Sequence, residues 1–184
     1  MTTQTKSGIK YRHRIEVDDF PESPRDWDNL SVFYCFHERY SLGDTHSIDR
    51  SRYDSWNDLA INEFDSDDVV VPLYLLDHSG LTLSTTPFSC PWDSGVVGYA
   101  VVSKERIISE YGVYNDDSKN KALTCIDSEV DIYNRYLCGD VYSILIEKKC
   151  GCCDSWTLVD SCVGYYGYEY AKSEAIALLD NLED

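Results

Sequence analysis

The chain has 184 residues, a length typical of one domain, and 43% of them are hydrophobic, enough for a packed core. Its 33 Asp and Glu against 16 Lys and Arg give a formal net charge of −17, which repels phosphate and disfavours direct nucleic-acid binding. Because there is no run of about 20 apolar residues and Met1–Lys10 lacks a signal-peptide core, we expect a cytoplasmic protein without a membrane span.

The first half of the chain predicts three strands and one helix. Residues 9–17 alternate between apolar and polar side chains, which indicates a half-buried strand. Residues 30–37 are apolar on both faces and indicate a central strand. Apolar residues recur at helical spacing over 51–64. Residues 69–76 are β-branched and apolar, so we expect a central strand, although Pro72 argues against pairing along one of its edges.

The second half predicts a long loop followed by alternating strands and helices. Residues 77–95 are rich in Ser, Thr, Pro and Gly and are expected to form the loop. The expected strands are 96–102, 141–148 and 156–163, the last two joined as a hairpin. The expected helices are 104–111, for which Ser103 is a suitable N-cap, then 119–137 and 168–182.

These elements together indicate an α+β fold. The strands come in neighbouring pairs separated by helices, a pattern that favours a mainly antiparallel sheet of about six strands with about four helices packed on one side. No linker or repeat interrupts the chain, so we expect one domain over 1–184 in which residues 1–8 are flexible.

The loop and its continuation to Gly98 gather side chains that are common in catalysis. His78 is a candidate base for Cys90 or Ser94, with Asp93 as the group that orients the imidazole. No spacing matches a nucleophile motif such as G-x-S-x-G, and the same residue types are ordinary turn formers. An ordered structural or binding loop is therefore the first expectation, and a catalytic site is the alternative.

A second cluster lies in the turn of the expected hairpin, where Cys150, Cys152 and Cys153 form a C-x-C-C sequence. A structural zinc site commonly has four ligands in two spaced pairs, so three neighbouring thiols are only a partial match. The sequence also contains no P-loop, no Rossmann glycine fingerprint and no H-E-x-x-H motif, so we expect no cofactor.

Acidic residues recur in short clusters that do not follow the pattern of a calcium-binding loop. Such clusters are either solvated loops or a surface that imitates nucleic-acid phosphates toward a basic groove. The residues that we expect to contact a partner are Asp18, Asp19, Glu22, Asp26 and Asp28 in the first cluster, and Glu63, Asp65, Asp67 and Asp68 in the second.

Several short strings resemble a known group of proteins when taken as a set. They include Pro24-Arg25-Asp26-Trp27, Cys35-Phe36-His37, Asp77-His78-Ser79-Gly80, Cys90-Pro91-Trp92-Asp93-Ser94-Gly95 and Asp160-Ser161-Cys162. On these strings the chain resembles a family of small acidic proteins carried by phages, prophages and plasmids, over roughly 24–167. The resemblance implies a mobile-element setting, in which small acidic proteins often block CRISPR or restriction nucleases of the host.

Charge and resemblance lead to one main hypothesis with two alternatives. The main hypothesis is a non-enzymatic inhibitor whose acidic clusters bind a basic, nucleic-acid-binding surface of a host protein. The first alternative is a small enzyme that uses the loop around His78 to modify a defence protein or hydrolyse a signalling molecule. The second is that the charge serves solubility alone. The protein would then act through self-association, for example as a homodimer, or through a role in the virion.

Overall fold

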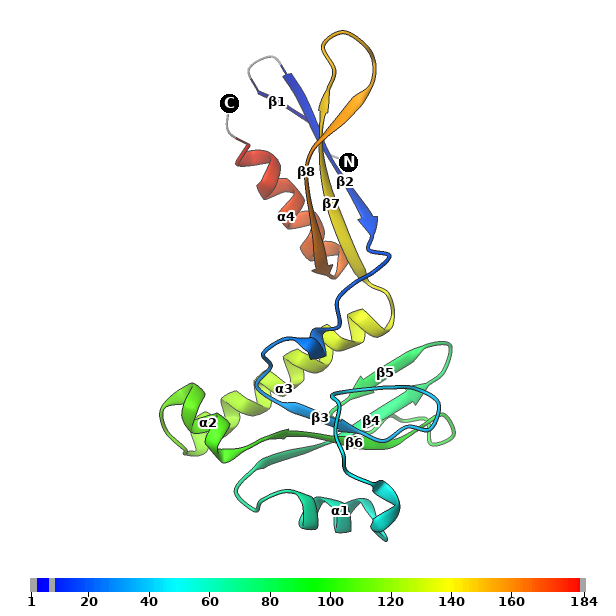
Figure 1. Ribbon diagram of the computed structural model, residues 1–184, viewed down its shortest axis with the longest axis vertical. Coiled ribbons are helices and arrows are strands. Elements are labelled where there is room, and N and C mark those ends of the chain that lie inside the picture. Colours follow the sequence, from blue (N-terminus) through cyan, green and yellow to red (C-terminus); the bar gives the residue numbers. More distant parts are fainter. Residues whose placement is uncertain (1–2, 7–8, 183–184) are drawn as a thin grey trace. The chain divides into compact units, whose positions relative to one another are not determined.

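The computed structural model describes residues 3–6 and 9–182, and the contacts of the chain divide it into two compact units. Unit 1 comprises 1–22 and 139–184, and unit 2 comprises 23–138. Unit 2 is therefore inserted between the two segments of unit 1, as the colours of Figure 1 show. The single domain over 1–184 stays a prediction, while each unit has its own sheet and its own core.

Unit 1 is an antiparallel sheet with one helix packed on it. The strand order is β1 (Thr3–Lys6), β2 (Ile9–Val17), β7 (Val141–Lys149) and β8 (Trp156–Tyr166), and the helix is α4 (Tyr168–Asp180) (Figure 1). Within the segment predicted to be flexible, residues 1–2 and 7–8 lie outside the described residues, whereas β1 pairs with β2. β7 and β8 form the expected hairpin.

The alternation of apolar and charged side chains along β2 determines which face of this sheet packs against α4. Tyr11 and Ile15 lie on the same face as Ile144 and Ile146 of β7, and this face packs against Ala175 and Leu179 of α4. The opposite face carries the charged positions of β2. There Arg12 is paired with Glu147 at 2.6 Å and lies over the Trp156 ring at 4.3 Å.

Unit 2 is built on a second antiparallel sheet. The strand order is β3 (Val32–Cys35), β6 (Ser94–Val102), β4 (Val69–Asp77) and β5 (Leu81–Ser84). Its helices are α1 (Trp56–Glu63), α2 (Lys104–Tyr111) and α3 (Asp116–Leu137), with single 3-10 turns at Pro24–Asp26 and Arg50–Arg52. Pro72 lies in the part of β4 that pairs with β6 alone, because pairing with β5 begins at Tyr74.

Helices cover both faces of this sheet. Along β6, Ala100 and Val102 belong to the core formed with α2 and α3, whereas Tyr99 and Val101 pack against Leu59 of α1. A strand buried on both faces has no polar face, which explains why 96–102 reads as a continuous apolar run. Gly98 is required here because a Cβ would lie 1.9 Å from the carbonyl oxygen of Tyr34 on β3.

A buried arginine joins the start of this sheet to α3. The side chain of Arg25 is 3% exposed and pairs with Asp44 at 2.7 Å and Glu129 at 3.1 Å. It also donates to the Ser31 carbonyl at 2.6 Å and lies 3.8 Å from the centre of the Phe33 ring. Both carboxylates also accept backbone N–H groups, so every strong polar atom in the network has a partner.

The fold class and the four α-helices confirm the α+β prediction, but the single sheet of about six strands is wrong. The strands form two four-stranded sheets, and in unit 2 the helices lie on both faces rather than one. The physical reason is that periodicity identifies a strand without identifying its partner. β2 pairs with β7, a strand that lies beyond the whole of unit 2 in the sequence.

Candidate functional site

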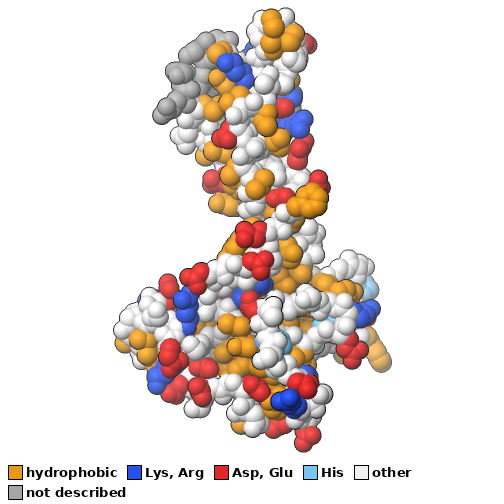
Figure 2. Space-filling view, in the orientation of Figure 1, with side chains coloured by type: hydrophobic (Ala, Val, Ile, Leu, Met, Phe, Trp, Pro, Cys, Tyr) orange, Lys and Arg blue, Asp and Glu red, His pale blue; other side chains and the backbone are white. Residues whose placement is uncertain are grey.

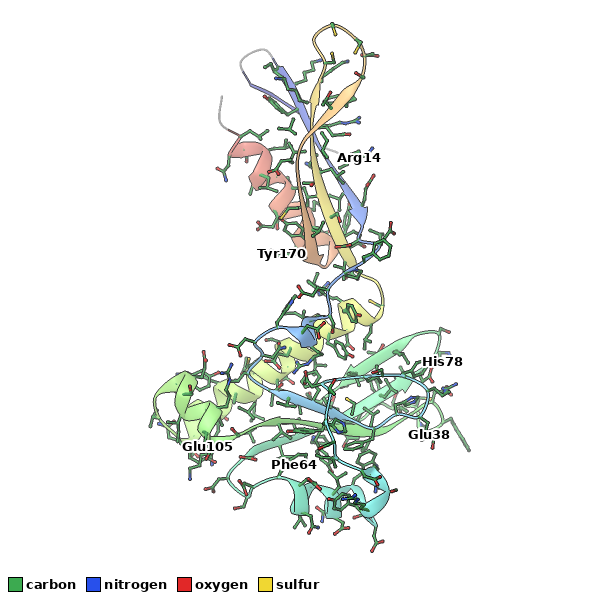
Figure 3. The ribbon with its side chains drawn as sticks, viewed as in Figure 1. Arg14, Glu38, Phe64, His78, Glu105 and Tyr170 are labelled. Carbon is green, nitrogen blue, oxygen red and sulfur yellow. The ribbon has the colours of Figure 1, made fainter. Side chains whose placement is uncertain are left out.

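The segment predicted as a loop over 77–95 is partly β-structure, and it brings its polar residues to one end of the unit 2 sheet. β4 ends at Asp77, β5 begins at Leu81 and β6 begins at Ser94. Antiparallel pairing therefore places these three strand ends together at one end of the sheet, which we call the Asp93 edge. The turn between β4 and β5 holds Ser79 at φ 57°, a left-handed conformation. His78 lies at this turn, as Figure 3 shows.

Asp93 is the centre of the polar contacts at this edge. Its Oδ2 atom lies 3.1 Å from Nδ1 of His78 and accepts a contact of 3.7 Å from the thiol of Cys90. The Asp93–His78 contact is the one that the sequence analysis assigned to an orienting carboxylate. The imidazole does not bond either candidate nucleophile among the described residues: the Cys90 thiol donates to Asp93, and the Ser94 hydroxyl donates to the Cys90 carbonyl.

Beside this group lies a hollow of about 380 Å³. Its lining includes Asp93, Ser94 and Trp92, which is 91% exposed. It also includes residues that were not predicted as site residues, namely His37, Arg39 and Asp77. Arg39 pairs with Asp77, so the hollow contains a cation beside carboxylates.

Two of the residues that were missed, His37 and Arg39, lie in the segment after β3, and Asp77 is the last residue of β4. Nδ1 of His37 accepts the N–H groups of Arg39 and Tyr40 at 3.2 Å, and the His37 and Tyr40 rings stack with centroids 4.9 Å apart. These contacts orient the segment so that Arg39 can pair with Asp77 at the end of β4. The strings Cys35-Phe36-His37 and Asp77-His78-Ser79-Gly80, which carry the resemblance, therefore meet at one edge although about 40 residues separate them in the chain.

The first acidic cluster is divided between the two units. Asp18, Asp19 and Glu22 belong to unit 1, whereas Asp26 and Asp28 belong to unit 2. Asp18 accepts the backbone N–H groups of Phe20 and Gly164 at 3.1 and 3.3 Å. Asp28 pairs with Arg106 at 2.8 Å. The cluster that is continuous in sequence is thus distributed over two separately packed bodies.

Three of the four residues of the second acidic cluster are brought together in unit 2, whereas Glu63 does not line their hollow and accepts the Tyr53 hydroxyl. A hollow of about 210 Å³ is lined by Asp65, Ser66, Asp67, Asp68, Lys104 and Glu105. We call this the acidic hollow. Lys104 pairs with Asp67 at 2.8 Å and lowers the pKa of that carboxyl, so it stays ionised. Asp68 accepts the backbone N–H groups of Asp65 and Lys104, which fixes the turn. Figure 3 places Glu105 on α2.

Three of the eight cysteines meet at the β7–β8 turn. The Sγ atoms of Cys150, Cys152 and Cys153 all lie within 4.8 Å of one another, and those of Cys150 and Cys152 are 3.0 Å apart. Hydrogen bonds from the Cys152 thiol, and then from the backbone of Cys152, lower the pKa of Cys150 to about 6. The other cysteines are Cys35, which is buried, and four dispersed thiols.

Comparison with known proteins adds no assignment to this geometry. No family model matches the chain, and no curated protein or solved structure matches it significantly. Among the helices of the described residues, none combines the length and apolar composition that a membrane crossing requires.

Proposed function

We propose that the protein is a non-enzymatic inhibitor from a mobile element that acts in the host cytoplasm. Its acidic hollow would bind a basic, nucleic-acid-binding surface of a host nuclease, either a CRISPR or a restriction enzyme. The observation that carries this proposal is the acidic hollow itself, which is lined by four acidic residues, Asp65, Asp67, Asp68 and Glu105, and by one lysine, Lys104.

The charge of unit 2 supports the same proposal. Residues 23–138 contain 20 Asp and Glu against nine Lys and Arg, a formal net charge of −11. On the face in Figure 2, red carboxylates outnumber blue cationic side chains over this unit. A field of this sign attracts cationic proteins and speeds their association, and it repels a nucleic acid.

Fixed geometry is a second support. Glu63 accepts the Tyr53 hydroxyl, Asp68 is held by two backbone N–H groups, and the Tyr114 hydroxyl donates to the Asp67 carbonyl. Carboxylates that are already held in place lose little conformational freedom when a partner binds, so more of the interaction free energy appears as affinity. The resemblance to proteins of phages, prophages and plasmids agrees with a defence enzyme as the partner.

The proposal is tested by inhibition of purified nucleases. A panel of CRISPR and restriction enzymes cleaves a fluorescent DNA in 50 and 300 mM NaCl at increasing concentrations of the protein. We expect inhibition of at least one enzyme, with an inhibition constant that rises about tenfold or more between the two salt concentrations. The double variant Asp65→Lys/Glu105→Lys, which replaces two exposed carboxylates of the acidic hollow, is expected to weaken inhibition by a further tenfold or more.

The matched control is Glu38→Lys/Asp131→Lys, which changes the charge of unit 2 by the same amount at exposed positions outside the acidic hollow. This variant is expected to inhibit almost as well as the wild type. The proposal is refuted when no enzyme of the panel is inhibited. It is also refuted when both double variants lose inhibition equally, because the total charge and not the hollow would then be responsible.

A second candidate function is a small enzyme at the edge that carries Asp93, favoured by the contact of one carboxylate with both His78 and Cys90 beside a hollow. A nucleophilic thiol is alkylated faster than an ordinary exposed one. We therefore expect iodoacetamide to modify Cys90 at least tenfold faster than the exposed Cys138, and more slowly in a His78→Ala variant. Equal rates at the two cysteines would exclude this function.

A further inference from the structure

The tip of the β7–β8 hairpin in unit 1 presents three thiols on one short turn. The turn is closed by the bond from Cys150 N to the Ser155 carbonyl at 2.9 Å, and by the ion pair between Lys149 and Asp154 at 2.6 Å. Cys152 and Cys153 are exposed. The tight closure explains why three cysteines within four positions direct their sulfur atoms to one point.

Three lysines lie beside the turn that carries these thiols. A hollow of about 450 Å³ is lined by Lys10, Lys148 and Lys149 together with Cys150. Ammonium groups near a sulfur atom stabilise a thiolate, and they offset the negative charge that several thiolates would bring together. This is a local cationic surface in a protein whose net charge is −17.

We propose that Cys150, Cys152 and Cys153 bind a single thiophilic metal ion, Zn²⁺ or Cu(I), at the tip of this hairpin. The site is independent of the acidic hollow and of the proposed inhibitor function. Thiolate ligands select Zn²⁺ and Cu(I) over the hard cations that prefer oxygen.

The distances fit this assignment. A Zn–S bond of about 2.3 Å in a tetrahedral site requires sulfur atoms about 3.8 Å apart. The three Sγ atoms lie within 4.8 Å of one another, and those of Cys150 and Cys152 are 3.0 Å apart, so small rotations of the side chains on this turn would be enough to reach the required spacing. The cluster includes no fourth Cys or His among the described residues. Zn²⁺ would therefore complete its shell with water, whereas Cu(I) is satisfied by three sulfur atoms.

Binding is accompanied by loss of protons. Each thiol that enters the coordination shell transfers its proton to solvent, and three thiolates with Zn²⁺ carry a net charge of −1. The sulfur atoms are not oxidised in this step, so the proposal requires thiols in the reduced state. It follows that binding weakens as the pH falls.

The test uses the full chain in metal-free buffer with a phosphine reductant. Zn²⁺ is titrated in competition with a chromophoric zinc chelator, and Cu(I) in competition with a chromophoric Cu(I) chelator, which distinguishes the two metals. We expect one equivalent of at least one metal per chain. The Cys150→Ser and Cys153→Ser variants are each expected to bind at least tenfold more weakly. Cys138→Ser and Cys162→Ser are the matched controls, because both remove an exposed thiol outside the cluster.

A second measurement does not depend on any substitution. Alkylation followed by mass spectrometry should show that the metal protects Cys150, Cys152 and Cys153, while Cys138 and Cys162 react at unchanged rates. The proposal is overturned when the wild type binds neither metal in a saturable way. It is equally overturned when the Cys150→Ser variant retains full affinity, or when the metal protects Cys138 as well as it protects the turn.

Discussion

Replacement of Arg25 by Met tests the most consequential contact in unit 2. Met keeps an unbranched apolar side chain against Phe33 but removes the guanidinium that lies between Asp44 and Glu129. The two carboxylates are 19% and 11% exposed, so they lose a cation in a site that water reaches poorly. Removal of one partner of a buried ion pair costs about 3–5 kcal/mol. The lost bond to the Ser31 carbonyl acts in the same direction.

Urea unfolding followed by tryptophan fluorescence measures this loss. Trp27, Trp56 and Trp92 lie in unit 2, so fluorescence reports mainly on the affected unit. With an m-value of about 2 kcal/mol/M, a loss of about 4 kcal/mol lowers the urea midpoint by about 2 M. Arg52→Met is the control, because Arg52 is 75% exposed and its ion pair with Asp49 is solvent-exposed, so its loss is expected to change the midpoint little. An Arg25→Met midpoint close to that of the control would refute the reasoning.

Three further predictions concern single positions. Burial lowers the pKa of His13, so below about pH 6.5 the unfolded chain binds more protons at this residue than the folded chain does. The free energy of unfolding of unit 1 should therefore fall as the pH drops through that value. In urea titrations from pH 7.5 to 5, the His13→Gln variant should show a weaker dependence on pH. Gly98→Ala should lower the thermal midpoint by several degrees or prevent folding of unit 2, since its Cβ meets Tyr34, whereas Gly95→Ala, with open space around it, should not. Asn115→Ala removes the capping box of α3 and should cost about 1 kcal/mol in urea unfolding, and an unchanged midpoint would contradict this.

The sequence predicted correctly those helices whose two ends are marked by capping residues. The helix over 104–111 has Ser103 as N-cap and ends at Gly112 with φ 74°, and both ends agree with the structure. By contrast, the helix expected over 119–137 begins earlier, at Asp116, because Asn115 is its N-cap. The residue types at an N-cap and in a turn are the same, so the sequence alone does not separate the two cases.

The short strand β5 shows why other elements were missed. Leu81–Ser84 is surrounded by Ser, Thr, Pro and Gly and has only four residues, too few for a periodic signal. Its conformation depends on tertiary contacts instead. It pairs with β4, and the side chain of Asn134 on α3 both accepts from and donates to the backbone of Leu83, at 2.7 and 2.8 Å.

The candidate site was predictable to the extent that its residues are close in sequence. His78 follows β4, Asp93 precedes β6, and only β5 and its flanking turns separate them in the sequence. The two side chains are in contact, as the pairing of an imidazole with an orienting carboxylate requires, whereas the catalytic role stays a prediction. Arg39 and His37 were not assigned to the site because pairing of β3 with β6 brings them there, and this pairing is not encoded locally. The thiol cluster at 150–153 was recognisable from the sequence because its three cysteines lie on a single turn.

The insertion of unit 2 between β2 and β7 has a consequence for biosynthesis. A ribosome completes residue 138 before the partner strand of β2 exists, so nascent Ile9–Val17 must wait without its native neighbour while unit 2 emerges. Once unit 2 has folded, Arg25 and Glu129 tie its entrance to its last helix, and the search of β2 for β7 no longer spans a disordered loop of more than a hundred residues. If unit 2 folds first, closure of unit 1 is therefore expected to be faster than it would be across a disordered insertion.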